Sequence, residues 1–140
     1  MQTKPFSQSL HDLCDPPARD AIIKYVNDTW DLKASYNPNQ YGVDLIIERG
    51  NDVVGFAEIE MRDWDRCPFK TIHIPKRKDK LLYNNMPTIY FVVSRDIKRS
   101  WYIDSQLIKN SSVFEIPNRD VSQGEYFYDI PTYLFTEIEL

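Results

Sequence analysis

The sequence contains few of the residues that mark several classes of protein. Cysteine and histidine each occur only twice in 140 residues. Cys14 and Cys67 lack the spacing of a zinc motif, which favours free thiols in a reducing compartment. No apolar run is long enough to cross a membrane, and the first residues lack the apolar core of a secretion signal. We therefore expect a cytoplasmic protein that does not enter membranes.

Strong positive charge is also missing. The net charge of −4 counts against a protein that coats nucleic acid without selectivity. The basic side chains are nevertheless concentrated in one stretch of eleven residues, which contains Lys70, His73, Lys76, Arg77, Lys78 and Lys80. This strip predicts contacts with phosphate groups or, equally well, a solvated charged loop.

The length and the apolar composition predict a single folded domain. We expect a flexible N-terminal arm over residues 1–14 and one domain over residues 15–140. Asp15, followed by two prolines, has the pattern of a helix start, and apolar residues at helical spacing continue to Trp30. An amphipathic helix is therefore expected at the start of the domain.

A β-hairpin is the clearest prediction. Residues 43–48 and 53–61 are rich in β-branched and apolar side chains, and a turn signal at 50–52 separates them. With a three-residue turn, Arg49 faces Val53 and Asp44 falls opposite Glu58. A two-residue turn would shift the register by one and place the two acids on opposite faces of the sheet.

Three carboxylates then share one patch of the hairpin. Side chains alternate along a strand, so Glu60 lies on the same face as Glu58, with Asp44 across from them. Acids inside apolar strands are costly to bury without a partner, which suggests a hard cation such as Mg²⁺ or Mn²⁺. The backbone carbonyl of Ile59 is a further candidate ligand. The alternative is that these acids only form the solvent-facing side of a hairpin.

The remaining elements indicate an α/β protein with a mixed sheet flanked by helices. A short basic helix is expected at 76–83 and a strand buried on both faces at 88–93. The other expected strands lie at 71–74, 101–107, 111–116 and 124–130. The order is helix–β–β–β–helix–β with further β structure at the C-terminal end.

This order, with Asp44 fourteen positions before Glu58-Ile59-Glu60, resembles the PD-(D/E)xK nuclease superfamily and its restriction-endonuclease-like fold. Three runs, at 58–64, 69–78 and 124–131, are similar to small nuclease-like proteins of phages and mobile elements. The resemblance implies a Mg²⁺- or Mn²⁺-dependent endonuclease or exonuclease that hydrolyses DNA. A phage-encoded protein of this kind would act in the host cytoplasm.

The resemblance also implies site residues. Asp44, Glu58, Glu60 and the carbonyl of Ile59 would hold the metal, and Asp20 would be a second-tier acid on the first helix. The motif has Lys where this chain has Glu60. In some relatives the Lys has moved to the following helix. The candidates here are Lys70, Lys76 and Lys78, of which Lys78 is favoured. Otherwise Glu60 is itself the base or a ligand, or the substitution marks a loss of catalysis.

The residues that would contact phosphate are Arg62, Lys70, Lys76 and Arg77. A domain of this size has little room for a module that reads sequence, so we expect structure-selective or weakly specific cleavage, or a homodimer that places two sites on one duplex. Two alternatives stay open. The first is a catalytically inactive binding or assembly protein on the nuclease fold, and the second is an inhibitor or adaptor that binds a protein partner through its aromatic C-terminal half.

Overall fold

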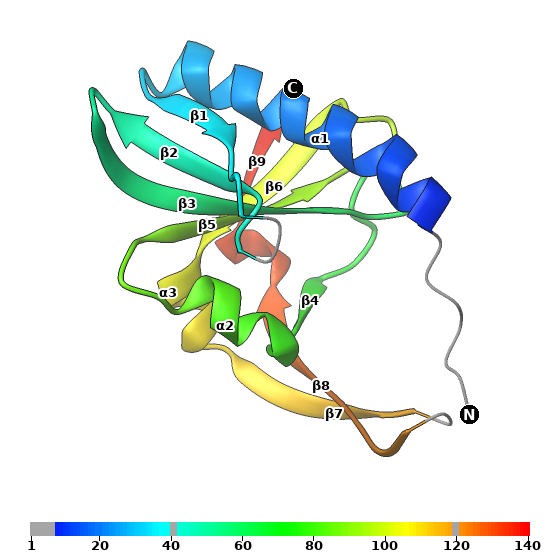
Figure 1. Ribbon diagram of the computed structural model, residues 1–140. Helices are drawn as coiled ribbons and strands as arrows, with labels where there is room; N and C mark the ends of the chain where they lie inside the picture. The colour runs from blue at the N-terminus through cyan, green and yellow to red at the C-terminus, as the bar shows by residue number, and fades with distance from the viewer. Residues whose placement is uncertain (1–7, 40–41, 119–120) are drawn as a thin grey trace.

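The computed structural model describes residues 8–39, 42–118 and 121–140. Figure 1 shows helix α1 (Gln8–Thr29) lying across one face of a large sheet, with a smaller sheet and two short helices on the opposite side. The fold is therefore a mixed α/β architecture with helices on both faces of the large sheet, as the sequence predicts.

The large sheet has six strands in the order β1-β2-β3-β5-β6-β9 among the described residues. Its central pair, β3 and β5, is parallel, and every other neighbouring pair is antiparallel. The strands are β1 (Lys33–Tyr36), β2 (Leu45–Arg49), β3 (Asp52–Met61), β5 (Thr88–Val93), β6 (Arg99–Asp104) and β9 (Thr136–Glu139).

The parallel β3–β5 pair requires a long crossover, because the chain must return to the same end of the sheet. That crossover contains strand β4 (Thr71–Pro75), the 3₁₀ turn η1 (Lys76–Lys78) and the short helix α2 (Asp79–Leu82). Strand β4 belongs to the smaller antiparallel sheet, whose order is β4-β8-β7. The other elements of this half are α3 (Ser105–Lys109), β7 (Ser112–Asn118), β8 (Val121–Pro131) and η2 (Thr132–Leu134).

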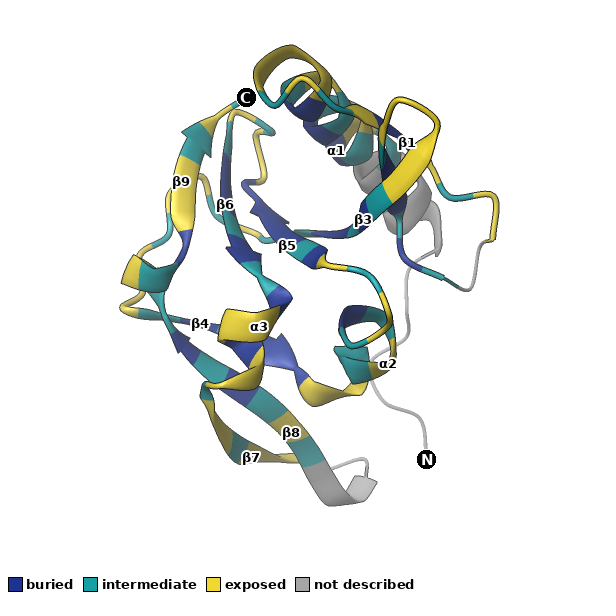
Figure 2. Cartoon of the chain, turned by 90° about the vertical axis from the view of Figure 1, so that its left-hand side faces the viewer, coloured by how far each residue is buried: buried dark blue, intermediate teal, exposed yellow. Residues whose placement is uncertain are grey.

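Two hydrophobic cores lie on the two faces of the large sheet. One packs α1 against the sheet and includes Ile22, Leu45 and Phe91. The other lies beneath the sheet, between it and the smaller sheet with α2 and α3, and includes Tyr90 and Ile130. Because Tyr90 and Phe91 are consecutive and belong to different cores, β5 is buried on both faces, as its nearly continuous apolar sequence predicts (Figure 2).

The β2–β3 hairpin reaches its predicted register by an unexpected route. Arg49 pairs with Asp52, so the turn has two residues rather than three, and its first residue, Gly50, has a φ of 62°. A β-bulge follows. Ile47 pairs with Gly55 and Glu48 pairs with Val53, so β3 has one extra residue between these two pairs. The bulge cancels the one-residue shift, and Leu45 pairs with Ala57. Asp44 and Glu58 therefore meet as predicted, although the predicted turn and the pairing of Arg49 with Val53 are wrong.

Several predicted boundaries need correction. Helix α1 begins at Gln8 rather than at Asp15, with two prolines inside it. Residues 8–14 of the predicted arm are therefore helical, and residues 1–7 lie outside the described part. The strand predicted at 101–107 ends at Asp104, because the Asp104 carboxylate accepts a hydrogen bond of 2.8 Å from the Gln106 amide and caps α3.

The composition of the sheet also differs from the prediction. The strand at 71–75 exists but lies in the smaller sheet, and β1, which was not predicted, completes the three-stranded antiparallel part of the large sheet. Strand β9 was not predicted. No helix among the described residues is long and apolar enough to span a bilayer. Cys67 is a free thiol, and the side chain of Cys14 lies outside the described part.

Candidate active site

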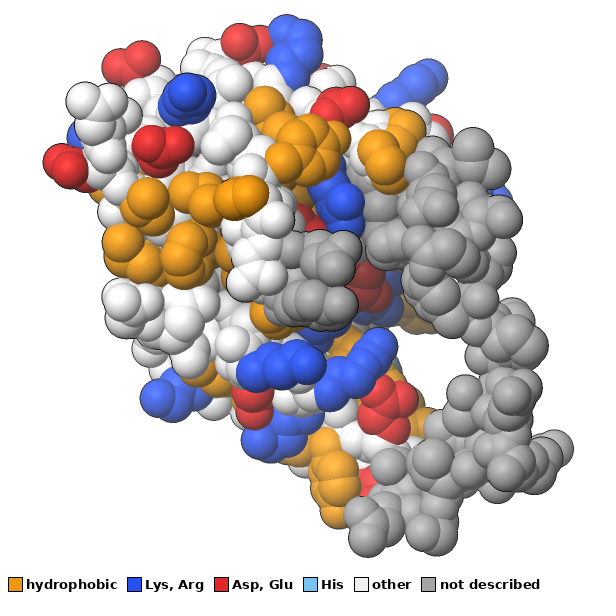
Figure 3. All heavy atoms as spheres, in the orientation of Figure 1, with side chains coloured by type: hydrophobic (Ala, Val, Ile, Leu, Met, Phe, Trp, Pro, Cys, Tyr) orange, Lys and Arg blue, Asp and Glu red, His pale blue; other side chains and the backbone are white. Residues whose placement is uncertain are grey.

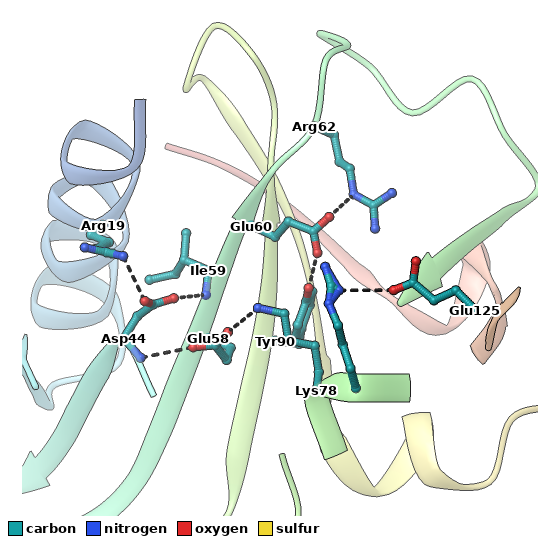
Figure 4. Close-up of polar contacts among 10 residues, drawn as sticks. Arg19, Asp44, Glu58, Ile59, Glu60, Arg62, Lys78, Tyr90 and Glu125 are labelled. Carbon is teal, nitrogen blue, oxygen red and sulfur yellow. Dashed lines mark hydrogen bonds and ion pairs between the residues drawn. The ribbon is translucent and has the colours of Figure 1, made fainter. Parts of the chain in front are cut away.

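Asp44 and Glu58 meet where the β2–β3 ladder ends (Figure 4). Glu58 Oε1 accepts a hydrogen bond of 3.1 Å from the backbone amide of Asp44, and Asp44 Oδ2 accepts one of 2.8 Å from the amide of Ile59. These two bonds extend the hairpin ladder by one step, because carboxylate oxygens accept from the backbone amides where carbonyl oxygens of the facing strand would otherwise accept. The hairpin therefore fixes both carboxylates against its own backbone.

Glu58 is the most deeply buried acid of the site, with only 3% of its surface exposed. Burial and the neighbouring carboxylate of Asp44 raise its pKa to about 7, although the ammonium of Lys78 acts in the opposite direction. Lys78 Nζ lies 3.0 Å from Glu58 Oε2. The structure thus brings the favoured lysine to the predicted acid from η1, twenty residues further along the chain.

The partner of Asp44 comes from helix α1. Arg19 Nη2 lies 3.0 Å from Asp44 Oδ1, and both side chains are largely shielded from solvent. The sequence singled out the adjacent Asp20 instead. Asp20 accepts a hydrogen bond from the hydroxyl of Tyr36, on the neighbouring strand β1. Burial of that hydroxyl and its bond to Asp20 raise the pKa of Tyr36 to about 12.

Glu60 lies on the same face of β3 as Glu58, but its carboxylate has different partners. Arg62 Nε lies 2.8 Å from Glu60 Oε1, and the hydroxyl of Tyr90 donates to Glu60 Oε2. Burial, followed by the charge of Glu60, holds the pKa of Tyr90 well above its usual value. Tyr90 is completely buried, so it fixes the direction of the Glu60 carboxylate from beneath the sheet.

The site therefore consists of three acid–base pairs along the end of the hairpin. Arg19 pairs with Asp44, Lys78 with Glu58, and Arg62 with Glu60. In the described part of the chain, no three Asp, Glu, His or Cys side chains are grouped in a way that could hold a metal ion. Asp44 and Glu58 are in contact, whereas Glu60 faces Arg62 and Tyr90, so the three-carboxylate ligand set stays a prediction.

Two carboxylates in contact are nevertheless a suitable start for a Mg²⁺ or Mn²⁺ site. Mg²⁺ is commonly bound by one or two protein carboxylates, with water and substrate oxygens completing its shell. Ile59 presents its amide to Asp44, and the N–H and C=O groups of one strand residue point to the same side of the strand. The carbonyl of Ile59 is therefore directed to the same edge of the hairpin, so the oxygen donors present fit such a cation.

The predicted phosphate-binding residues surround this site without all entering it. Lys76 pairs with Asp79 at 2.9 Å, and Arg77 pairs with Glu125 at 3.2 Å. Lys70 is exposed on the loop before β4. Figure 3 shows Lys and Arg side chains close together on the face seen in Figure 1, intermixed with acidic side chains. Two of these predicted contacts, Lys76 and Arg77, would therefore have to exchange an acidic partner for a phosphate.

Arg19 and Tyr90 are the site residues that sequence reasoning missed. Arg19 follows the buried Ala18 and lies three positions before the buried Ile22, so helical periodicity places it beside the stripe of α1 that faces the sheet. Tyr90 stands in a nearly continuous apolar strand, where a buried hydroxyl needs a hydrogen-bond partner. Both signals were present in the sequence, but the identity of each partner required the fold.

Comparison with known proteins adds little. No family model and no curated protein matches the sequence. Among solved structures, D212, a nuclease from a fusselovirus, matches over 96% of this chain and 90% of its own, with 14% identity and a TM-score of 0.49. A likeness of this size does not assign a function, so the functional argument rests on the geometry of the site.

Proposed function

We propose that this protein is a metal-dependent nuclease that hydrolyses phosphodiester bonds in DNA, with a site of the PD-(D/E)xK kind on a restriction-endonuclease-like core. The observation that carries the proposal is the contact between Asp44 and the buried Glu58, with Lys78 3.0 Å from Glu58. A buried carboxylate held beside a second one is unfavourable for stability. Such an arrangement is typical of a functional site, where unfavourable charges are retained for chemistry.

Asp44, Glu58 and the carbonyl of Ile59 would hold Mg²⁺ or Mn²⁺. The bound cation would neutralise charge on the scissile phosphate and lower the pKa of a water molecule. The protein contributes the fixed direction of the two carboxylates, because each is hydrogen-bonded through the end of the β2–β3 ladder. That rigidity holds the oxygen donors in place before the substrate arrives.

Lys78 would orient the attacking water or hold a phosphate oxygen. Its side chain is 27% exposed, whereas that of Glu58 is 4% exposed, so the ammonium lies between the buried acid and solvent. A cation in this position can reach a substrate at the surface while it stays bonded to the acid beneath it. This is the role that a lysine two residues after Glu58 would have in the usual motif.

Glu60 is proposed as a third ligand or as the base. For either role its carboxylate would turn from Arg62 toward Glu58, since its present partners are Arg62 and Tyr90. Arg62, once released, would be available for a phosphate oxygen, together with Lys70, Lys76 and Arg77. Because these phosphate contacts carry no sequence information, we expect structure-selective or weakly specific cleavage.

Calorimetric titration with Mn²⁺ tests the metal site directly. Wild-type protein is compared with a Glu58→Ala, Glu60→Ala variant and with Asp52→Ala, which removes an exposed acid from the same strand. All three are then incubated with linear duplex, single-stranded and four-way-junction DNA. We expect Mn²⁺ binding and cleavage by the wild type and Asp52→Ala but not by the double variant. Cleavage that survives in the double variant would refute the proposal.

A binding or assembly protein without catalysis is the second candidate. It is favoured by the pairing of every site carboxylate with a basic side chain, because the described residues leave no excess negative charge for a cation to neutralise. The same titration separates the two candidates. An absence of Mn²⁺ binding and cleavage in correctly folded wild-type protein would refute the first candidate and favour the second.

A further inference from the structure

A cavity of about 170 Å³ adjoins the proposed site. Its lining residues are Arg62, Trp64, Phe69, Thr71, Ile72 and His73. Arg62 connects it to the site, since its Nε lies 2.8 Å from Glu60 while its Nη2 donates to the backbone carbonyl of His73. Figure 4 shows Arg62 beyond Glu60 in the row of side chains that begins at Asp44. The cavity therefore opens where the row of site residues ends.

We propose that this cavity binds an unpaired base of the DNA strand that is cut. The inference rests on the proposed nuclease function and adds the class of substrate. It follows from the chemistry of the walls, which combine aromatic rings with a guanidinium group. Base–aromatic stacking and basic contacts with the backbone are the two interactions through which proteins bind single strands without reading their sequence.

One aromatic wall is fixed by packing. The ring of Trp64 lies 5.0 Å from that of Trp101, edge to face, and Trp64 packs against the core beneath the large sheet. The loop that carries it is also held, because the amide of Arg95 donates to the carbonyl of Trp64 at 2.9 Å. Trp64 thus forms a rigid side of the cavity.

The other aromatic wall is Phe69, which is 61% exposed. The backbone beside this exposed ring is nevertheless anchored. Thr132 Oγ1 donates to the carbonyl of Phe69 at 2.9 Å, and the Thr132 amide donates to the carbonyl of Lys70 at 2.8 Å. The backbone is thus fixed while the ring stays exposed beside Trp64 in the cavity lining, which suits contact with a ligand.

The polar groups of the cavity suit a nucleotide. Arg62 Nη1 has no hydrogen-bond partner among the described residues, so a donor is available for a phosphate or for a base edge. Thr71 and His73 add a hydroxyl and a ring nitrogen, 3.5 Å apart. Lys70, next to Phe69, is exposed and can contact the backbone of a strand whose base stacks on the ring.

The aromatic surface continues beyond the cavity onto the smaller sheet. The ring of His73 lies 4.7 Å from that of Phe114 and 6.4 Å from that of Phe127. Arg62, directly after β3, lies four positions beyond Glu58, which corresponds to about 13 Å along an extended chain. The unpaired base would therefore lie within a few nucleotides of the scissile phosphate. Substrates with single-stranded ends, flaps or open junctions should be preferred over blunt duplex.

The test compares wild-type protein with Phe69→Ala and with Tyr126→Ala, which removes an exposed aromatic ring outside the cavity lining. Fluorescence anisotropy without divalent metal gives the affinity for a labelled duplex with a single-stranded extension and for a blunt duplex. Cleavage of both is then measured with Mn²⁺. We expect Phe69→Ala to weaken binding of the extended duplex about 5- to 150-fold, as the loss of one stacked base predicts, and to leave blunt-duplex binding unchanged.

The outcomes separate this inference from the proposed function. Equal affinity of wild type and Phe69→Ala for the extended duplex would overturn the inference, even if the wild type cleaves DNA. Equal losses in Phe69→Ala and Tyr126→Ala would overturn it as well. A Phe69-dependent preference in a protein that cleaves no DNA would support the base-binding cavity while it refutes the nuclease proposal.

Discussion

Glu58 accepts a hydrogen bond of 3.1 Å from the backbone amide of Asp44, so each acid of the pair is held by the strand that faces it. In the other direction, Asp44 Oδ2 accepts a hydrogen bond from the backbone amide of Ile59, next to Glu58. Neither carboxylate can leave without exposing a backbone donor at the end of the hairpin. The position of the two acids is thus a property of the sheet and not of flexible side chains.

The raised pKa of Glu58 predicts a stability that falls as pH rises. Its ordinary value of 4.5 applies to the unfolded chain, whereas burial and Asp44 raise it to about 7 in the folded protein. Between these pH values the folded state binds a proton that the unfolded chain has released. The free energy of unfolding should therefore decrease by about 3 kcal/mol across this window.

Glu58→Gln should remove that dependence. We expect the variant to be more stable than the wild type at pH 8, by up to about 3 kcal/mol, and equally stable at pH 4. Urea unfolding at both pH values measures the difference, and Glu48→Gln on the neighbouring strand is the control. A wild-type pH profile in Glu58→Gln would show that the pKa of this acid is not raised.

Lys78→Ala should lower the rate of cleavage about 10²- to 10³-fold while the protein stays folded. The reason is that the ammonium is the basic group in contact with Glu58, 3.0 Å from its Oε2. Single-turnover cleavage in Mn²⁺ is the measurement. Lys80→Ala, which removes an exposed lysine two residues away, should cleave at the wild-type rate. Equal rates in the two variants would exclude Lys78 from the reaction.

Tyr90→Phe should destabilise the protein by about 1–3 kcal/mol. The change removes a fully buried hydroxyl that donates to the charged carboxylate of Glu60, and bonds of this kind lie at the strong end of the range. Chemical denaturation measures the loss. Tyr102→Phe is a suitable control, because the Tyr102 ring packs against Trp30 while its hydroxyl has no hydrogen bond to the described residues. Equal stability changes in both variants would contradict the role of the bond.

Gly55→Ala should disturb the junction of β3 and β5. A Cβ atom at Gly55 would lie 3.0 Å from the backbone carbonyl oxygen of Pro87, and the next amide, that of Phe56, bonds to the same oxygen at 2.8 Å. Because a backbone carbonyl cannot rotate away, we expect a loss of about 1–3 kcal/mol in thermal or chemical unfolding. Val54→Ala, at the adjacent half-exposed position, should cost less. The reverse order would contradict this reading of the close approach.

Much of the central architecture could be predicted because its signals are local. Strand and helix periodicity identified the first helix, the hairpin and the strand at 88–93, and the shared face of Glu58 and Glu60 follows from alternation alone. The hairpin register was predicted correctly for the wrong reason. A two-residue turn and a bulge together have the same effect as the expected three-residue turn, and the apolar pattern does not distinguish them.

The remaining features depend on contacts between distant parts of the chain. Strand β1 is short, and its sequence next to Asn37 and Pro38 has turn character, so only its pairing with β2 reveals it. The placement of β4 in a second sheet is likewise set by β8, more than fifty residues later. Helical periodicity places Arg19 beside the buried stripe of α1. It does not predict the ion pair with Asp44, because the spacing of residues within a helix does not show which strand the helix crosses.

The one-to-one matching of acids and bases has a consequence for how the protein responds to chelators. Asp44, Glu58 and Glu60 each have one basic partner in the protein. The Arg and Lys side chains therefore already occupy the positions next to the carboxylates that a metal ion would take. A divalent ion would enter by exchange for a guanidinium group, such as that of Arg19 at Asp44, and not by filling a void. The chain should consequently reach and keep its native fold in the presence of EDTA, and metal removal should stop catalysis without unfolding the protein.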